Sequence, residues 1–531
     1  MHITCLNTPV CSTSGEETEL DCHLFHGKNI HEVVQILSEK YSGDVVFILE
    51  KDNTLTVLRP PFSEFVVFYS FIKDKIELWS GYYIPEKIIN NPPTYNFSYL
   101  SGWLLNPAWC TPETGLSDIN ELLSGAVLFF DGEVLEQKDL LSGTVMGLGN
   151  GSGKDFEQTA DHFRNLILNS TQHKTKQFNS KFSISCSGGL DSSVVSIAAE
   201  KVSREWPVPL LNCYSEEDYH GDERFYFRII NEMVKGKPFE VETNSLSSRN
   251  SLSSDLLAPS ARPCKMSAAV GIQTLLFRMT AKNGCQMILT GDGGDQLFLK
   301  LNKTFIWKEI LEANFSGVSF MKIISGLAIQ QRQSFWSVLK DVISRESLKQ
   351  YRGYFFGEMK FPASDLLCTR VHCSASLVPN QHLLKNIGYS KLFQFFGMRN
   401  AEFNRIAIRG CNIQERKVFV FWPLVKAALQ TPRMFHMIDG NDRAIERMAF
   451  RKELPDEIFY RKSKGAGRDI LSRYDYECLA ETLLQGPACR HGFVSREKLQ
   501  QIKNKNIEVE TAASLIRATA LNDWMKFYEY T

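Results

Sequence analysis

The chain has 531 residues, of which 43% are hydrophobic and 23% charged, and its 60 basic side chains equal its 60 acidic ones in number. This length predicts two or three domains, and the composition is that of a soluble globular protein. A formal net charge of zero argues against a nucleic acid or an anionic membrane as partner, because both require a basic surface.

The sequence shows neither a membrane span nor a disulfide framework. No apolar run approaches the roughly 18–20 residues of a membrane helix, and the most hydrophobic short run, Val418 to Leu424, reads as core. The N-terminus lacks a basic segment followed by an apolar one, so no signal peptide is expected. The 13 cysteines are scattered without a C-x-x-C pair, which predicts buried, inert thiols and a cytoplasmic protein.

Residues 1–145 predict a β-rich domain with an antiparallel sheet. Short apolar or alternating runs separated by turn residues predict its strands at Val45–Leu49, Thr54–Leu58, Phe65–Phe71 and Ile76–Trp79. Residues 146–154 then form a glycine-rich linker. A dinucleotide-binding loop is the less favoured interpretation of these glycines, because no apolar strand leads directly into them.

Residues 155–531 predict a second domain of the α/β class. Its elements alternate along the chain: helix Phe156–Leu168, strand Phe182–Cys186, helix Ser193–Val202, strand Pro209–Tyr214, helix Phe225–Val234, helix Ala268–Lys282 and strand Gln286–Thr290. This alternation predicts a mainly parallel sheet. From about Lys308 onward the pattern is mostly helical, which predicts a helical C-terminal region.

The first strand of this domain is joined to its helix by Ser187-Gly188-Gly189-Leu190-Asp191-Ser192-Ser193. Open α/β sheets bind ligands at this edge, and paired glycines let the backbone approach a phosphate closely. The serine hydroxyls, including that of Ser193, add donors. Asp191 would repel phosphates unless Mg²⁺ lay between them, so the loop predicts an ATP and Mg²⁺ site. The alternative is an ordinary helix start capped by Asp191 or Ser192.

A second loop follows the later strand and reads Gly291-Asp292-Gly293-Gly294-Asp295. Asp295 is the candidate for the second Mg²⁺ ligand, and Asp292 could orient or deprotonate an amine. A plain Gly-Asp turn is the alternative. A third segment, Leu454 to Gly467, contains Lys462 and Lys464 in a glycine-flanked loop, where a lysine could balance charge on a leaving pyrophosphate.

Together these three segments resemble the asparagine synthetase-like family of N-type ATP pyrophosphatases. The family's Ser-Gly-Gly-x-Asp-Ser loop is matched at Ser187 to Ser192, its second motif loosely at Gly291 to Phe298, and its Leu-Pro…Arg-x-Lys segment at Leu454 to Lys464. The resemblance implies ATP binding by Ser187, Gly188, Gly189, Leu190, Asp191, Ser192 and Gly291, Mg²⁺ held by Asp191 and Asp295, and catalysis by Lys464 and Asp292. Because Lys464 stands one residue beyond the family position, Lys462 is the other candidate.

The resemblance extends more weakly to residues 1–145. Gly43-Asp44 and Arg59 are similar to landmarks of the family's glutaminase (Ntn-type) domain, but its nucleophilic cysteine after the initiator Met is replaced by His2, and the first cysteine is Cys5. This implies a degenerate glutaminase-like domain without glutamine hydrolysis, so the nitrogen comes from an amine that binds directly.

Gly293-Gly294-Asp295 and the Lys-rich run at Arg461 to Lys464 resemble most closely the lasso-peptide cyclases of this family. That resemblance implies adenylation of an Asp or Glu side chain of a ribosomally made precursor peptide, ring closure by the peptide's N-terminal amine, and a maturation protease as partner. The alternatives are an ammonia-dependent asparagine synthetase, a β-lactam-forming synthetase and, outside enzymes, an inactive nucleotide-sensing partner protein.

Overall fold

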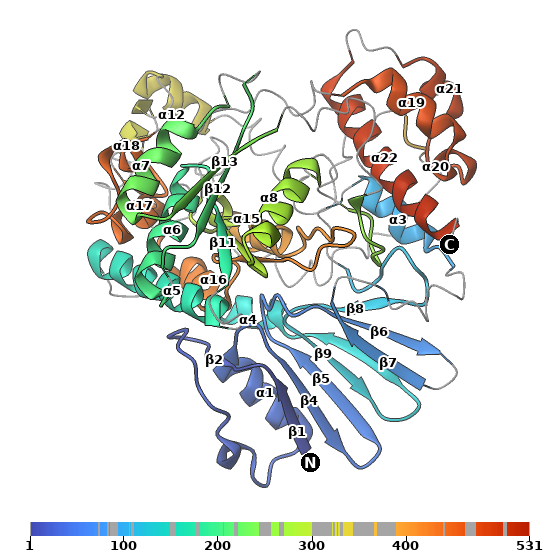
Figure 1. Cartoon of the computed structure of the whole chain (residues 1–531). Coiled ribbons are helices and arrows are strands. Elements are labelled where there is room, and N and C mark those ends of the chain that lie inside the picture. The colour runs from blue at the N-terminus through green and yellow to red at the C-terminus, as the bar shows by residue number, and fades with distance from the viewer. Residues whose placement is uncertain are drawn as a thin grey trace.

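The structure is a computed structural model. It describes residues 2–72, 75–81, 84, 94–105, 107, 111–148, 155–176, 181–204, 206–216, 221–243, 256–264, 270–299, 321, 324–326, 328–329, 333–343, 366–368, 389–438, 441–461, 474–502 and 507–529. Antiparallel sheets, a parallel sheet with flanking helices and a C-terminal helical bundle occupy three regions of the molecule (Figure 1). Among the described residues, no helix combines the length and apolar character needed to cross a bilayer.

Two antiparallel sheets form the N-terminal region. The larger has the order β1-β4-β5-β9-β10 and contains β1 (His2–Leu6), β4 (Val46–Lys51), β5 (Thr54–Arg59), β9 (Ala126–Phe130) and β10 (Leu135–Asp139). The smaller has the order β7-β6-β8 and contains β7 (Lys75–Ser80), β6 (Val67–Ile72) and β8 (Asn120–Leu122). The flanking elements are β2 (Val10–Cys11), β3 (Tyr41–Ser42), α1 (Ile30–Lys40), α3 (Phe97–Leu105), α4 (Leu141–Gly147) and a 3₁₀ turn at Cys22–Phe25.

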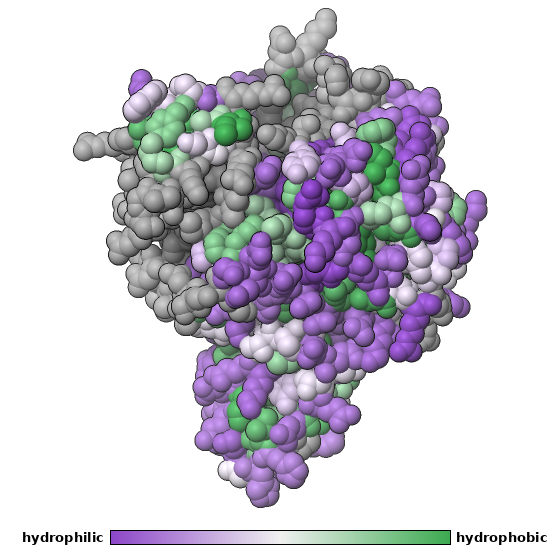
Figure 2. Space-filling model, turned by 90° about the vertical axis from the view of Figure 1, so that its left-hand side faces the viewer, coloured by the Kyte–Doolittle hydropathy of each residue, from purple (hydrophilic) through white to green (hydrophobic). Residues whose placement is uncertain are grey.

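These elements stack in the order helix, sheet, sheet, helix. Phe47 and Leu49 of β4 pack with α1, whereas Val46 and Ile48, which alternate with them, pack with the smaller sheet, because successive side chains of a strand point to opposite faces. On the far side of the smaller sheet, Phe68 packs with Leu100 of α3. The side of the molecule seen in Figure 2 narrows toward these sheets, and its described surface is mainly hydrophilic.

The central sheet has five strands in the order β13-β12-β11-β14-β15, and every pairing is parallel. Its strands are β11 (Phe182–Ser185), β12 (Pro209–Tyr214), β13 (Lys237–Glu242), β14 (Met287–Thr290) and β15 (Gln414–Lys417). The helices around it are α5 (Phe156–Lys176), α6 (Leu190–Val202), α7 (Arg224–Val234), α8 (Val270–Lys282), α9 (Gly294–Leu297), α12 (Phe335–Ile343), α15 (Tyr389–Glu402), α16 (Trp422–Gln430), α17 (Ala444–Ala449) and α18 (Asp456–Phe459). A 3₁₀ turn at Arg433–His436 and the hairpin β16 (Met437–Ile438) and β17 (Asn441–Asp442) precede α17.

Alternate residues of the central strands supply two different cores. Leu210 and Leu289 pack with α5, α6 and α16, and Leu211 and Ile288 pack with α8 on the opposite face. The mixed α/β class with a parallel sheet is therefore confirmed, and the run from Val418 to Leu424 is core as predicted.

The C-terminal helices form a bundle against α3. They are α19 (Tyr476–Gln485), α20 (Pro487–Arg490), α21 (Arg496–Gln500) and α22 (Val509–Glu529). Leu515 and Leu521 of α22 are fully buried in the same cluster as Leu100 of α3. The chain's last described helix thus packs beside α3 of the N-terminal region (Figure 1).

Several local predictions need correction. The edge strands β13 and β15 were not predicted, because charged residues dominate their sequences. Helix α6 begins at Leu190 rather than Ser193, α5 continues to Lys176, and α4 occupies the first two positions of the predicted linker. Among the described cysteines only Cys186 and Cys285 are buried, so the general prediction of buried thiols is wrong. The domain boundaries near residues 145 and 155 stay predictions.

Candidate active site

The first glycine loop runs from β11 into α6 and is closed by its own serines. The hydroxyl of Ser192 accepts a hydrogen bond from the Ser187 amide (3.2 Å) and donates to the Gly189 carbonyl (3.1 Å). Gly189 is the N-cap, without a side-chain capping bond, so capping by Asp191 or Ser192 is wrong. Ser193 is fully buried and donates to the Gly189 carbonyl (2.8 Å), so its predicted role as a phosphate donor is also wrong.

The second loop, which follows β14, packs directly on the first. A Cβ on Gly294 would lie 2.7 Å from Cγ of Asp191, and one on Gly291 would lie 2.9 Å from the Asp191 carbonyl carbon. Both distances are too short for any side chain, so these two positions require glycine for the loops to meet. The glycines of the second motif therefore set the distance between the two acidic loops.

The carboxylates of Asp191 and Asp295 converge on a single atom. Nη1 of Arg443 donates to Oδ1 of Asp191 and to Oδ1 of Asp295, each at 2.7 Å. Burial opposes the charged guanidinium, but nearby carboxylates, with Asp191 foremost, raise the pKa of Arg443 above its usual value. Sequence reasoning missed Arg443, which directly precedes α17 and lies far from both loops along the chain.

This convergence is compatible with the predicted Mg²⁺. Mg²⁺ commonly takes one or two carboxylates plus substrate phosphates and water, and Asp191 and Asp295 already face one cationic atom. The described residues include no group of three or more His, Cys, Asp or Glu side chains arranged to hold a metal. A magnesium ion here would have two protein ligands and would replace the guanidinium of Arg443 between them.

Glu446 of α17 places a third acid beside this pair. It is fully buried, and its carboxyl group lies against that of Asp191. Burial, followed by the negative charge of Asp191, raises the pKa of Glu446 well above its usual value.

Asp292, in the second loop, lies beside a buried lysine. Its carboxylate is 3.4 Å from Nζ of Lys417 and accepts a hydrogen bond from the Asn404 side chain at 3.3 Å. Glu415 lies two residues before Lys417 on β15. Burial raises the pKa of Glu415 to about 7, although the charge of Lys417 opposes this rise. A carboxyl group that titrates near neutral pH thus lies close to Asp292.

The two loops line one cleft, which encloses about 920 Å³ of space, part of it open to solvent. The predicted site residues that line it are Ser187, Gly189, Asp191, Ser192, Gly291, Asp292 and Asp295. Gly188 and Leu190 are not among the lining residues: Gly188 packs on the backbone of Phe227, and the Leu190 side chain belongs to the hydrophobic core.

The third segment is held against the back of the first loop. Nη1 of Arg461 donates to the Gly188 carbonyl (3.1 Å), and its guanidinium lies 3.7 Å from the ring centre of Tyr226. Arg447 in turn donates to the Arg461 carbonyl at 2.9 Å. Lys462 and Lys464 follow immediately and lie outside the described residues.

An open parallel sheet with two glycine loops and converging acids at the carboxyl ends of adjacent strands defines an α/β protein that binds its ligand at this edge. A family model described as asparagine synthase matches residues 162–526, more than half of the chain, and the chain belongs to this family. The family forms amide bonds with ATP, so the chain is an enzyme of the amide synthetase kind. No curated protein matches it in sequence.

Proposed function

We propose that the chain is an ATP-dependent lasso-peptide cyclase. It adenylates an Asp or Glu side chain of a precursor peptide and closes a macrolactam with the peptide's N-terminal amine. The observation that supports this proposal best is the convergence of Asp191 and Asp295 beside a glycine loop that lines a cleft. The phosphates of ATP lie along the Ser187–Ser192 loop, where Asp191 and Asp295 would hold a Mg²⁺ ion that would neutralise part of their charge.

The reaction has two steps. An oxygen of the peptide carboxylate attacks the α-phosphorus of ATP, and pyrophosphate leaves. The N-terminal ammonium then loses a proton, its nitrogen attacks the acyl carbon, and AMP leaves. Asp292 orients the ammonium, whose unperturbed pKa of about 7.7–8.0 makes deprotonation inexpensive near neutral pH. Holding amine and acyl group together can supply roughly 7–11 kcal/mol of the barrier reduction, and Lys464 stabilises negative charge in both steps.

Two observations favour a peptide amine over ammonia released from glutamine. Burial raises the pKa of Cys5 to about 12, which disfavours the nucleophilic thiolate. Arg59 is fully buried and donates to Glu121, Glu402 and two backbone carbonyls, so its guanidinium is unavailable to an incoming substrate. The layer order of the N-terminal sheets agrees with a glutaminase-like domain that has lost this activity.

The test is the reaction itself. Candidate precursor peptides, chosen from short genes that neighbour this one and a protease gene, are incubated with ATP and Mg²⁺. We expect peptide-dependent pyrophosphate release and a product that is one water lighter. Lys464→Ala should suppress ring closure far more than Lys462→Ala, and the reverse ranking would transfer the role to Lys462. Conversion of free aspartate and ammonia to asparagine would instead select the asparagine synthetase alternative, and absence of any pyrophosphate turnover would select the inactive nucleotide-sensing one.

A further inference from the structure

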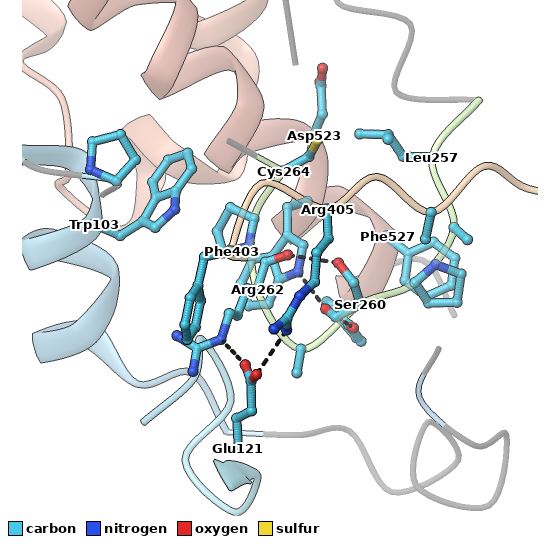
Figure 3. A pocket seen from close by; sticks show the side chains of 18 of the residues that line it. Trp103, Glu121, Leu257, Ser260, Arg262, Cys264, Phe403, Arg405, Asp523 and Phe527 are labelled. Carbon is cyan, nitrogen blue, oxygen red and sulfur yellow. Dashed lines mark hydrogen bonds and ion pairs between the residues drawn. The ribbon is translucent and has the colours of Figure 1, made fainter. Parts of the chain in front are cut away.

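A second, aromatic-lined pocket lies between the N-terminal sheets and the C-terminal helices (Figure 3). It encloses about 1000 Å³ of space, part of it open to solvent. Its aromatic lining comes from β6, α3, the segment after α15, and α22, and includes Phe68, Tyr99, Trp103, Phe403, Trp524 and Phe527. A predominantly apolar lining with a few polar groups is typical of ligand sites, and the proposed reaction leaves this pocket without a role.

One extended segment separates this pocket from the nucleotide cleft. Phe403, Arg405 and Ala407 line the aromatic pocket, whereas Asn404 and Ile406 line the cleft. Side chains of an extended chain alternate between its two sides, so the two cavities lie back to back across a single stretch of backbone. The segment is held on both sides, because the Ala258 amide donates to the Ala407 carbonyl (2.9 Å) and Lys417 donates to the Asn404 carbonyl.

The charges in the aromatic pocket are already balanced. Nε of Arg262 binds one oxygen of Glu121 at 3.0 Å, and Nη1 of Arg405 binds the other at 2.8 Å (Figure 3). With Asp523, the four charged lining residues sum to a formal charge of zero. A phosphate-bearing ligand needs cations directed at it, and here both guanidinium groups are directed at a fully buried carboxylate. The pocket therefore favours an uncharged ligand with apolar side chains.

We propose that the aromatic pocket binds an apolar segment of the peptide substrate while the reacting carboxyl and amino groups lie in the nucleotide cleft. This inference rests on the proposed function, which makes the substrate a peptide. Aromatic and aliphatic side chains of the peptide pack on the aromatic rings, and the 403–407 segment fixes their position relative to Asp292. Binding of the apolar segment in this pocket thereby orients the peptide's carboxyl and amino groups in the cleft.

The experiment measures binding of two dye-labelled, N-acetylated peptides by fluorescence anisotropy, without ATP. One has the sequence Gly-Trp-Phe-Leu-Gly and the other Gly-Lys-Glu-Lys-Gly. We expect the full chain to bind the apolar peptide at least about tenfold more tightly. Equal binding of the two peptides, or binding of neither, would overturn the proposal.

Variants in the aromatic pocket and in the nucleotide cleft show which of the two cavities holds the bound peptide. Ala407→Trp fills the pocket, and Phe527→Ser removes an aromatic wall. Each should weaken apolar-peptide binding about tenfold or more, with folding verified by thermal unfolding. Asn404→Leu, on the cleft side of the same segment, and Asp191→Asn should leave binding within about twofold. Binding that responds to Asn404→Leu but not to Ala407→Trp would place the peptide in the cleft and contradict the pocket assignment.

This assay and the enzymatic test can fail separately. If the chain prefers the apolar peptide and the pocket variants weaken its binding, but precursor peptides yield no pyrophosphate, the cyclase proposal fails and the pocket remains a peptide site. If cyclisation occurs but Ala407→Trp and Phe527→Ser leave the KM for the precursor unchanged, the pocket proposal fails alone.

Discussion

The molecule contains two clusters in which one arginine bridges two carboxylates, and they differ in their surroundings. Arg59 contacts Glu121 at 3.0 Å and Glu402 at 3.1 Å, and all three side chains are completely inaccessible to solvent. Arg443 contacts Asp191 and Asp295 at 2.7 Å each, but the Asp295 side chain is 31% exposed, at the edge of the cleft. The Arg59 cluster is thus enclosed by protein, whereas the Arg443 cluster is accessible from the cleft.

This difference separates a structural function from a ligand-binding one. The Arg59 cluster joins β5 and β8 of the N-terminal region to α15 beside the parallel sheet, and Arg59 also donates to the carbonyls of Ser63 and Leu122. An enclosed cluster fixes how the regions meet, and breaking it leaves a buried charge unpaired. The acids of the Arg443 cluster are reachable from the cleft, and the proposed Mg²⁺ ion would take the place of the guanidinium there.

The largest expected effect is loss of activity when the accessible acids are changed. Asp191→Asn and Asp295→Asn should each lower pyrophosphate release by about 100-fold or more, since each removes a charge that positions the nucleotide phosphates through a cation. Neither substitution should change the unfolding temperature much, because Arg443 keeps one acidic partner. Full activity in either variant, measured with the precursor peptide, would remove the metal assignment.

The enclosed cluster should respond in the opposite way. Glu402→Gln leaves Arg59, Arg399 and Arg405 around an uncharged group, and it should cost about 3–5 kcal/mol of unfolding free energy while the folded fraction keeps its activity. The control is Glu136→Gln, which breaks a surface ion pair with Lys138 and should cost less than about 1 kcal/mol. Equal losses in chemical denaturation would show that burial does not distinguish the pairs.

The accessible acids were predictable, and their partners were not. Asp191 and Asp295 follow the strand-to-helix loops of neighbouring strands, so local pattern and parallel-sheet topology suffice to bring them together. Arg443 and Lys417 contact the acids of the two loops through tertiary packing of distant segments, and the residues around them in the sequence do not reveal which of many basic side chains will do so. β15 was missed for a related reason, because this edge strand reads Gln-Glu-Arg-Lys and carries Glu415 and Lys417 toward the site.

A smaller effect should follow when the bridging cation is removed from the accessible cluster. In Arg443→Met, the acids near the cleft repel one another, so the unfolding free energy without Mg²⁺ should fall by about 2–3 kcal/mol. Added Mg²⁺ should then stabilise this variant more than the parent chain, in which the ion must displace a guanidinium.

The matched control is Arg461→Met, which removes a guanidinium from the back of the same loop without touching Asp191 or Asp295. Its stabilisation by Mg²⁺, measured by thermal unfolding, should equal that of the parent chain. If Arg443→Met gains no more from Mg²⁺ than Arg461→Met does, the ion does not bind between the two acids.

The smallest expected effect is on the pH dependence of the unfolding free energy, and it comes from the Glu415 carboxyl group. Its pKa is raised from 4.5 to about 7, chiefly by burial. Between these values the folded chain holds a proton that the unfolded chain has released, so the corresponding stability is complete below about pH 4.5 and is lost as the pH rises through about 7. Because Glu415 is only partly buried, solvent screening should limit this contribution to on the order of 1–2 kcal/mol.

Glu415→Gln should therefore reduce, by that amount, the difference in unfolding free energy between pH 5 and pH 7.5, measured by urea denaturation. Glu446 changes stability in the same direction but is present in both proteins, so its contribution cancels. An unchanged difference would mean that Glu415 is ionised throughout this range.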